Sequence, residues 1–394
     1  MISERQLFLQ HIAQTSENPL LLDIDKGEGI FLFDKSGKKY IDLISGIAVS
    51  NLGHSNPQVI KAIFEQIKKY SHIMVYGEYI QSPQVKLAEL LTNHLPSNLN
   101  SVYFVNSGSE ATEGALKLAK KYTQRNQIIS FKNAYHGSTH GALSVMGEEK
   151  MKRPFRPLLP GVKFIDFNSA EQLKFITDKT AAVIVEPIQG EAGIILPEND
   201  FLLKIKERCK KSNTLLIFDE AQTGLGRTGR LFAFEHYNVI PDILLLAKAL
   251  GGGMPLGAFI SSKKIMNTLS YEPVLGHITT FGGHPVSCAA AYASLDVVLK
   301  EELIQSIPEK EKLFRKYLKH PRIKKIKGKG LFLAIELDSS DNLHKTIKLA
   351  INKGIIIDWF LFNQTSIRIA PPLIINEKQI IEVCNTLISC LNEI

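Results

Sequence analysis

The sequence contains little cysteine, a single tryptophan and no long apolar run. Its four cysteines have no paired spacing in 394 residues, which argues against a disulfide framework or a metal site and favours a reducing cytoplasm. No apolar run approaches the ~20 residues that a membrane-spanning helix requires. The first residues lack the small-residue cleavage pattern of a signal peptide. We therefore expect a cytoplasmic globular protein with no metal and no membrane partner.

The net charge is positive, with 47 Lys and Arg against 39 Asp and Glu. A positive field favours anionic ligands such as phosphates and dicarboxylates. The densest basic run, 319–329, interleaves Ile323 and Ile326 with its lysines. No aromatic platform or nucleic-acid motif accompanies this run. We interpret it as a half-exposed surface element and predict no nucleic-acid partner, although nucleic-acid binding is kept as the alternative from a different class.

The middle of the chain repeats a short apolar run, a polar or glycine-rich turn and a helical pattern. The apolar runs predict strands over 102–105, 128–131, 181–185, 215–218 and 243–246. Strands that are apolar throughout and alternate with helices predict a parallel sheet covered on both faces, and hence an α/β fold. Such a sheet binds ligands at the carboxyl ends of its strands.

The pattern changes after about residue 290. Helical patterns near 286–299 and 301–318 precede an apolar strand at 331–336, and a last helix begins at Glu377. This order is typical of a smaller α+β domain. We predict an N-terminal segment, 1–45, that packs with this small domain, a large domain at 46–288, and the small domain itself at 289–394.

Two candidate catalytic residues end neighbouring predicted strands. Asp219 follows the run 215–218, and Lys248 follows the next run, 29 residues later, about one strand–helix–strand unit. Alone, the Asp would be a turn cap and the Lys a solvated side chain. Together they match a pyridoxal phosphate (PLP) enzyme, which needs a lysine for a Schiff base and an acid that keeps the pyridine nitrogen protonated. A sheltered lysine has a lowered pKa and is a usable nucleophile.

Two further loops offer groups that the same cofactor needs. Ser107-Gly108-Ser109 stands between a predicted strand and a helix, so free N–H groups there suit a phosphate. A plain helix cap by Ser109 is the simpler alternative. Tyr135, beside His136 and a glycine, offers an aromatic ring that can stack on a pyridine face. An aromatic residue in a loop is otherwise usually packing.

The run 224–229 matches the dinucleotide pattern G-x-G-x-x-G. That pattern should open directly from a strand into a helix and be followed by an acid about 20 residues later. Here five polar or small residues separate the run from its strand, and the acid is absent at that spacing. We therefore do not predict a nicotinamide cofactor.

Longer motifs resemble those of class III aminotransferases, most of all the acetylornithine and ornithine aminotransferase subgroup. They occupy 106–117, 135–137, 186–193, 218–229, 241–248 and 280–283, in order and at family spacing, within a match from about Gly29 to Leu373. The resemblance implies the type I PLP-transferase fold, with a large domain built on a mostly parallel sheet and a smaller α+β domain. It also implies a homodimer with shared active sites.

The resemblance assigns roles around the cofactor ring. Lys248 would carry PLP as a Schiff base and then move a proton between substrate and cofactor. Asp219 would pair with the pyridinium, and Gln222 would hydrogen-bond the ring hydroxyl. Tyr135, next to His136, would stack on the ring.

The resemblance also assigns the phosphate and substrate sites. Ser107, Gly108 and Ser109 would hold the phosphate, together with Thr280 supplied by the partner subunit. Arg368 resembles the arginine that grips an α-carboxylate, and Glu191 resembles its switching partner. These assignments complete the predicted cofactor and substrate sites.

Ser138 departs from the pattern of the family. Acetylornithine aminotransferases usually read His-Gly-Arg-Thr where this chain reads 136–139 as His-Gly-Ser-Thr, and serine cannot clamp a carboxylate as arginine does. The donor is therefore held differently or lacks a carboxylate at that end. We predict transfer of the terminal amine of an ornithine-like donor, with or without an N-acyl group, to 2-oxoglutarate, as in arginine biosynthesis. The alternatives are another ω-amino donor, such as 4-aminobutyrate or lysine, or an aminomutase of the same class.

Overall fold

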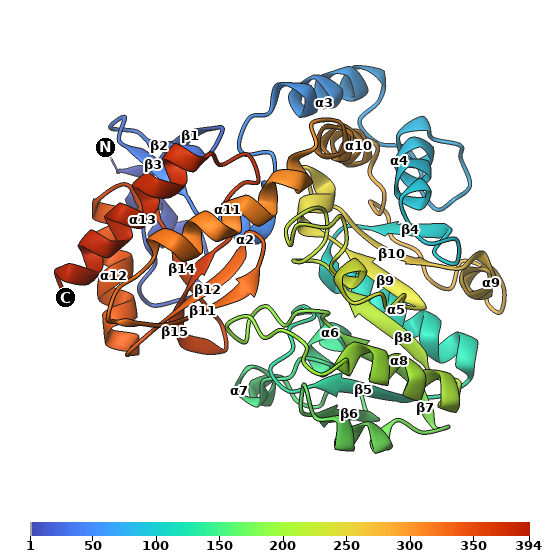
Figure 1. Ribbon diagram of the computed structural model, residues 1–394. Helices are drawn as coiled ribbons and strands as arrows, with labels where there is room; N and C mark the ends of the chain where they lie inside the picture. The colour runs from blue at the N-terminus through green and yellow to red at the C-terminus, as the bar shows by residue number, and fades with distance from the viewer. Residues whose placement is uncertain (1) are drawn as a thin grey trace.

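A seven-stranded sheet forms the centre of the larger part of the molecule in the computed structural model, which describes residues 2–394 (Figure 1). In spatial order the strands are β4 (Ser101–Val105), β10 (Gly257–Ser261), β9 (Ile243–Leu246), β8 (Leu215–Asp219), β7 (Thr180–Val185), β5 (Gln127–Phe131) and β6 (Val162–Ile165). The pairs from β9 to β6 are parallel, whereas β10 is antiparallel to both neighbours. The predicted α/β fold with a mostly parallel sheet is confirmed, and β6 and β10 are strands that we did not predict.

Alternate residues of each strand face two different helical layers. In β7, Val185 belongs to a core shared with the first layer and Ile184 to a core shared with the second. The first layer is formed by α4 (Ser82–Asn93), α8 (Phe201–Ser212) and α10 (Pro285–Lys300), and the second by α5 (Gly108–Thr123). Because helices cover both faces, consecutive positions of these strands are buried and mostly apolar, rather than every second one.

Both ends of the chain build a second group of strands beside the large sheet (Figure 1). One sheet contains β1 (Ile24–Glu28), β2 (Phe31–Asp34), β3 (Lys39–Asp42) and β13 (Ile355–Ile356), and the other contains β11 (Ile323–Lys329), β12 (Phe332–Leu337), β15 (Asn363–Ile369) and β14 (Asp358–Phe360). Their core is shared with α11 (Leu303–Tyr317), α12 (Ser340–Asn352) and α13 (Glu377–Asn392). This part has the α+β character expected of the small domain.

The predicted domain boundaries remain proposals. Ile30, Ile41 and Leu43 share a core with residues of the C-terminal part, as expected for a segment that packs with the small domain. The predicted boundary at 288/289, however, falls inside α10, which packs on α3 (Pro57–Lys69) and α4. We propose that the boundary lies after α10, between Lys300 and Leu303.

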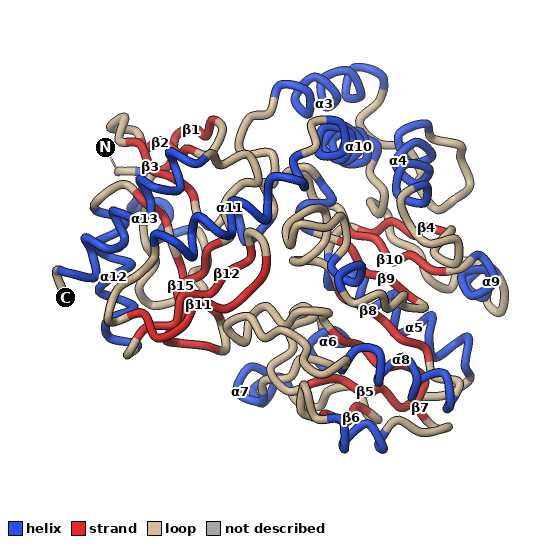
Figure 2. The backbone as a smooth tube through the Cα atoms, in the orientation of Figure 1, coloured by secondary structure: helices blue, strands red, loops and turns tan. Residues whose placement is uncertain are grey.

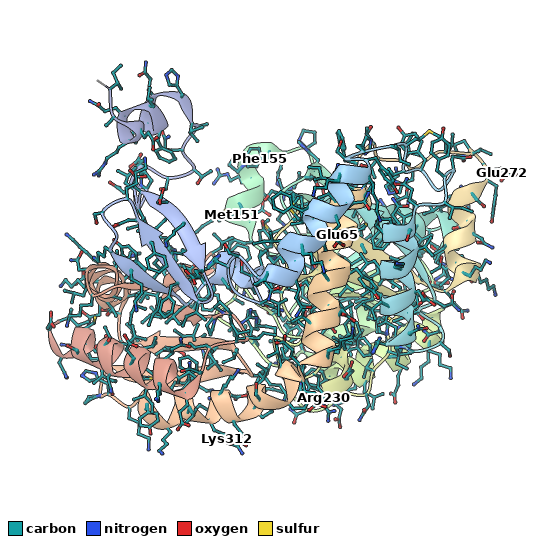
Figure 3. The ribbon with its side chains drawn as sticks, turned by 90° about the horizontal axis from the view of Figure 1, so that it is seen from above. Glu65, Met151, Phe155, Arg230, Glu272 and Lys312 are labelled. Atoms are coloured by element: carbon teal, nitrogen blue, oxygen red, sulfur yellow. The ribbon has the colours of Figure 1, made fainter. Side chains whose placement is uncertain are left out.

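The N-terminal helix α1 (Glu4–His11) stands away from the rest of the molecule when it is seen from above (Figure 3). None of its residues is buried, and a capping box between Ser3 and Gln6 fixes its first turn. An ion pair between Glu4 and Lys35 joins it to the loop after β2. None of the helices described between residues 2 and 394 is both long and apolar enough to cross a membrane.

Candidate active site

Lys248 lies just beyond the carboxyl end of β9. Loops gather between the two parts of the molecule (Figure 2). Lys248 begins a short 3-10 turn with φ of +51°, a backbone conformation that is uncommon for residues other than glycine and often marks functional sites. Its side chain lines a cavity of about 380 Å³. The other lining residues are Val49, 106–109, 135–137, Asp219, Ala221, Ala247 and 253–256.

Asp219 ends β8 in the same cavity and is buried. Its Oδ2 lies 2.8 Å from His136 Nδ1, and its Oδ1 accepts a hydrogen bond of 3.0 Å from the N–H of Ala221. The hydroxyl of Thr112 donates to the carbonyl of His136 and so fixes the loop that carries the imidazole. His136 Nε2 is buried with no hydrogen-bond partner among the described residues. The carboxylate is therefore held in one orientation by partners that offset its burial.

The amine of Lys248 is chemically different from that of an exposed lysine. Burial lowers the pKa of Lys248, while the carboxylates of Asp219, Glu191 and Glu186 act in the opposite direction. The net shift is downward, because burial is the largest effect. A larger fraction of the amine is therefore neutral and nucleophilic near neutral pH.

Glu186 belongs to the site, although we predicted no role for it. It follows β7, whose six residues are all buried, and its carboxylate accepts hydrogen bonds from the N–H groups of Tyr135 and Gly190. Burial raises the pKa of Glu186 to about 7. A charged residue directly after a fully apolar strand was the available sequence signal, because that position lies at the same sheet edge as Asp219.

The predicted phosphate loop lies at the start of α5. The hydroxyl of Ser107 caps this helix by accepting a hydrogen bond of 3.2 Å from the N–H of Glu110. A Cβ added to Gly108 would lie 3.3 Å from the Cβ of Ala247, so the helix start packs closely against the residue before Lys248. The first N–H groups of a helix have no acceptor within it and can bind an anion. The loop can therefore hold a phosphate at the lysine.

Tyr135, which lines the cavity, forms a neutral polar pair with Ser138. The Tyr135 hydroxyl lies 3.2 Å from Ser138 Oγ, and the Ser138 N–H donates to Ser109 Oγ at 3.2 Å. Gly137, with φ of +122°, provides the turn between them. The pair offers hydrogen bonds but no charge at the position where the subgroup usually has an arginine.

Arg368 and Glu191 form a buried ion pair between the two parts of the molecule. Nη2 of Arg368, on β15, donates to Glu191 Oε2 at 2.8 Å, and Gln222 Nε2 donates to Glu191 Oε1 at 3.1 Å. Burial alone would raise the pKa of Glu191, but Arg368 and the hydrogen bonds from Leu361 and Gln222 hold this pKa below its usual value. Gln222 Oε1 has no partner among the described residues.

Thr280 lies outside this cavity in the single chain. It is exposed in the loop before α10, while its neighbour Thr279 accepts a hydrogen bond of 2.9 Å from Asn106 Nδ2. The predicted residues that line the cavity are Ser107, Gly108, Ser109, Tyr135, His136, Asp219 and Lys248. Ser138 contacts Tyr135, and Gln222, Glu191 and Arg368 form a separate hydrogen-bonded group. The assignment of Thr280 to the active site of a partner subunit stays a prediction.

A larger cavity, of about 770 Å³, lies at the opposite end of α5. Lys117, Lys120, Lys121 and Lys179 are among its lining residues. It contains neither Lys248 nor Asp219 and lies away from the carboxyl ends of the strands. The chemistry therefore belongs to the smaller cavity.

Comparison with known proteins identifies the class. Residues 12–391 match the family described as Aminotransferase class-III, and the chain belongs to this family. It is 43% identical over 383 residues to the acetylornithine aminotransferase of Methanocaldococcus jannaschii, covering 94% of this chain and 93% of that protein. It is 40% identical to the succinylornithine transaminase of Yersinia pseudotuberculosis, covering 96% and 94% of the two chains.

The fold agrees with this class. The chain superposes on the ornithine aminotransferase of Toxoplasma gondii with a TM-score of 0.92 at 31% identity, covering 100% of this chain and 95% of that one. The protein is a PLP-dependent transaminase with the type I fold, as predicted. The residues present fit the cofactor, because Lys248, Asp219 and the start of α5 line one cavity. In addition, the buried His136 Nε2 and Gln222 Oε1 have no hydrogen-bond partner among the described residues.

Proposed function

We propose that the enzyme transfers the terminal amine of an ornithine-like donor, with or without an N-acyl group, to 2-oxoglutarate, and so forms glutamate. The observation that carries this proposal is the proximity of the Arg368–Glu191 pair to Lys248, whose pKa both charges influence. An arginine that Glu191 can either pair with or release, close to Lys248, suits alternate binding of an amine and a dicarboxylate. The three relatives named above, which are named for ornithine and its acyl derivatives, support this donor class.

We propose that the residues around Lys248 hold the cofactor ring and move protons. Bound PLP supplies an electron sink for the carbon that carries the substrate amine. Lys248 Nζ would hold the cofactor and then take the proton from that carbon. Asp219, oriented by His136, would keep the pyridine nitrogen protonated, and Gln222 Oε1 would accept a hydrogen bond from the ring hydroxyl. Tyr135 would cover the ring face.

The phosphate and substrate sites complete the proposal. Ser107, Gly108 and Ser109 would bind the phosphate through the start of α5. Glu191 would occupy Arg368 while the amino donor is bound and would leave when the carboxylate of the 2-oxo acid arrives. One site could then accept both substrates in turn.

We also propose a homodimer with shared active sites. Large apolar side chains are exposed on α3, on the segments beside α4 and in the loop that carries Thr280, and the two most exposed are Ile80 at 94% and Val274 at 71%. Exposed apolar surface of this kind is typical of protein interfaces. Dimerisation would cover it and bring Thr280 to the phosphate of the partner subunit.

A panel of amino donors tests the proposal. Purified PLP-loaded enzyme is incubated with 2-oxoglutarate and acetylornithine, succinylornithine, ornithine, lysine or 4-aminobutyrate, and glutamate is measured. We expect the highest kcat/KM with an ornithine derivative and loss of turnover in Lys248→Ala. Glutamate formation from none of the ornithine derivatives would refute the proposal, and an aminomutase would release no glutamate at all.

Ser138 supports a second candidate donor class. Since the Tyr135–Ser138 pair is uncharged, it provides no clamp specific for the α-carboxylate of an ornithine derivative, and 4-aminobutyrate or lysine form the second donor class. The same panel separates the two, because such a donor would then exceed every ornithine derivative in kcat/KM.

If the donor is acetylornithine, the reaction belongs to arginine biosynthesis. The four buried, free cysteines of the described chain suit a reducing cytoplasm.

A further inference from the structure

Arg368 faces a second carboxylate, that of Asp358. Asp358 on β14 is the direct cross-strand partner of Arg368 on β15. Its Oδ1 lies 3.3 Å from Arg368 Nε, yet neither atom has an aligned hydrogen bond among the described residues. The guanidinium is thus placed between Glu191 at Nη2 and Asp358 at Nε, while Nη1 is buried without a partner among those residues.

The pair between Asp358 and Arg368 does not have the geometry of a stabilising ion pair. Burial raises the pKa of Asp358 to about 6, against the effect of Arg368, and the carboxylates of Glu191 and Asp42 act in the same direction as burial. Asp358 Oδ1 is buried without a hydrogen-bond partner among the described residues, and buried ion pairs contribute little to stability. The presence of Asp358 therefore points to a role in the site.

The strand that carries Asp358 also holds the guanidinium in two other ways. The carbonyl of Trp359 accepts a hydrogen bond of 3.1 Å from Nη2, and the ring of Phe360 lies 4.7 Å from Cζ of Arg368. Glu191, in contrast, comes from the loop after β7. When Glu191 leaves, the three contacts from β14 remain. The contacts from β14 therefore hold Arg368 in place, while Glu191, from a different segment, covers it.

We propose that Asp358 is a positioning residue for Arg368 that sets how tightly the enzyme binds the carboxylate of its 2-oxo acid. Asp358 holds Nε while the carboxylate of the acceptor takes Nη1 and the position on Nη2 that Glu191 vacates. Its negative charge weakens this binding, so that the product amino acid is released. The inference rests on the proposed function, because it takes Arg368 as the arginine that binds the acceptor.

The charges around Asp358 define the expected pH dependence. Arg368 on β15, Glu191 in the loop after β7 and Asp42 on β3 face it, and Asp42 is itself paired with His54 at 2.9 Å. Protonation of Asp358 removes one negative charge beside Arg368. As the pH falls through about 6, binding of a dicarboxylate should therefore tighten.

The test uses Asp358→Asn in the PLP-loaded enzyme, with glutarate as the probe. Isothermal titration calorimetry measures glutarate binding independently of turnover. We expect glutarate to bind about five- to tenfold more tightly, and the KM for the acceptor to fall by the same factor, because a like charge has been removed at close range. The change of glutarate affinity with pH should disappear. The kcat/KM of the amino donor should stay within about twofold, since Glu191 still covers Arg368 in that half of the reaction.

Three controls decide between the outcomes. Asp338→Asn removes a carboxylate that lies 3.0 Å from Arg322 on the same part of the molecule, and it should change neither value. Asp358→Leu removes both the charge and the contact to Nε, so it should weaken glutarate binding relative to Asp358→Asn. An unchanged or raised Kd for glutarate in Asp358→Asn would overturn the inference. If Arg368→Met also left glutarate binding unchanged, the proposed function itself would have failed, so the two failures are distinguishable.

Discussion

The imidazole Nδ1 of His136 lies 2.8 Å from Oδ2 of Asp219 in a buried pair. The two residues are 83 positions apart in the chain and meet because β5 and β8 end at the same edge of the sheet. The imidazole fixes the direction of the carboxylate, and the unpartnered Nε2 of His136 is turned away from it. The carboxylate is therefore fixed before the cofactor binds.

Replacing Asp219 by Asn should separate charge from position. The amide oxygen can still accept a hydrogen bond from His136, but it cannot keep the pyridine nitrogen of PLP protonated, so we expect kcat to fall by at least about 100-fold. Steady-state kinetics at saturating PLP measure this loss, and circular dichroism checks the fold. Asp166→Asn, in an exposed pair 2.7 Å from Lys132, is the matched control. A decrease of less than threefold would contradict the proposed role of Asp219.

Replacing Ser138 by Arg should restore the carboxylate clamp that the subgroup usually has. The arginine would lie beside the Tyr135 hydroxyl, which now contacts Ser138 at 3.2 Å, and a bidentate pair with a carboxylate strengthens binding. We expect the KM for acetylornithine to fall by about tenfold relative to that of the parent enzyme, as for an added charged hydrogen bond of ~1.5 kcal/mol. Ser138→Ala controls for loss of the hydroxyl. An unchanged KM for acetylornithine in Ser138→Arg would exclude a carboxylate contact at this position.

The strand ends were predictable because their signal is local. Each of the five predicted strands is a largely apolar run, interrupted only by Ser130 in 128–131, and helices on both faces of the sheet favour that pattern. The antiparallel direction of β10 was not predictable, since it depends on how the chain crosses back over the sheet rather than on the residues of 257–261. The fold class was therefore accessible from sequence, and the strand order was not.

The site was predictable only in part from the residues alone. Lys248 and Asp219 were found from their position after apolar runs, whereas the pairing of Arg368 with Glu191, across 177 residues, came from the resemblance to a family. Asp358 was missed because its contact with Arg368 depends on the register between β14 and β15. A one-residue change in that register would turn the carboxylate to the other face of the sheet. Such contacts are set by tertiary pairing.

Glu220 should make the stability of the protein depend on pH. It is buried, accepts hydrogen bonds from the N–H groups of Ala233 and Phe234, and burial raises its pKa from 4.5 to about 7. The folded state therefore binds the proton between these values and the unfolded state does not, so this stabilisation is complete below pH 4.5 and is lost as the pH rises through about 7.

Glu220→Gln should remove this dependence. Chemical denaturation at pH 5 and at pH 8 gives the unfolding free energy of the parent and of the variant. The decrease from pH 5 to pH 8 should be smaller in the variant by up to about 3 kcal/mol, because each pKa unit corresponds to about 1.4 kcal/mol. The exposed Glu382 provides the control variant Glu382→Gln, which should match the parent. A parallel fall in Glu220→Gln and the parent would show that Glu220 does not titrate in this range.

Ile80→Glu should convert the proposed dimer to monomers. In the single chain the side chain is 94% exposed, so the substitution should leave the fold of the monomer intact. In a dimer that covers this surface, an unpaired carboxylate would be buried, which costs several kcal/mol and raises the dimer Kd by about 100-fold or more. Sedimentation over a range of concentrations measures this shift, and Leu203→Glu on α8, at a side chain 45% exposed, is the control. PLP should also dissociate more readily from the Ile80→Glu monomer, because Thr280 of a second subunit would no longer reach the phosphate. If the parent protein itself is a monomer, the prediction is wrong.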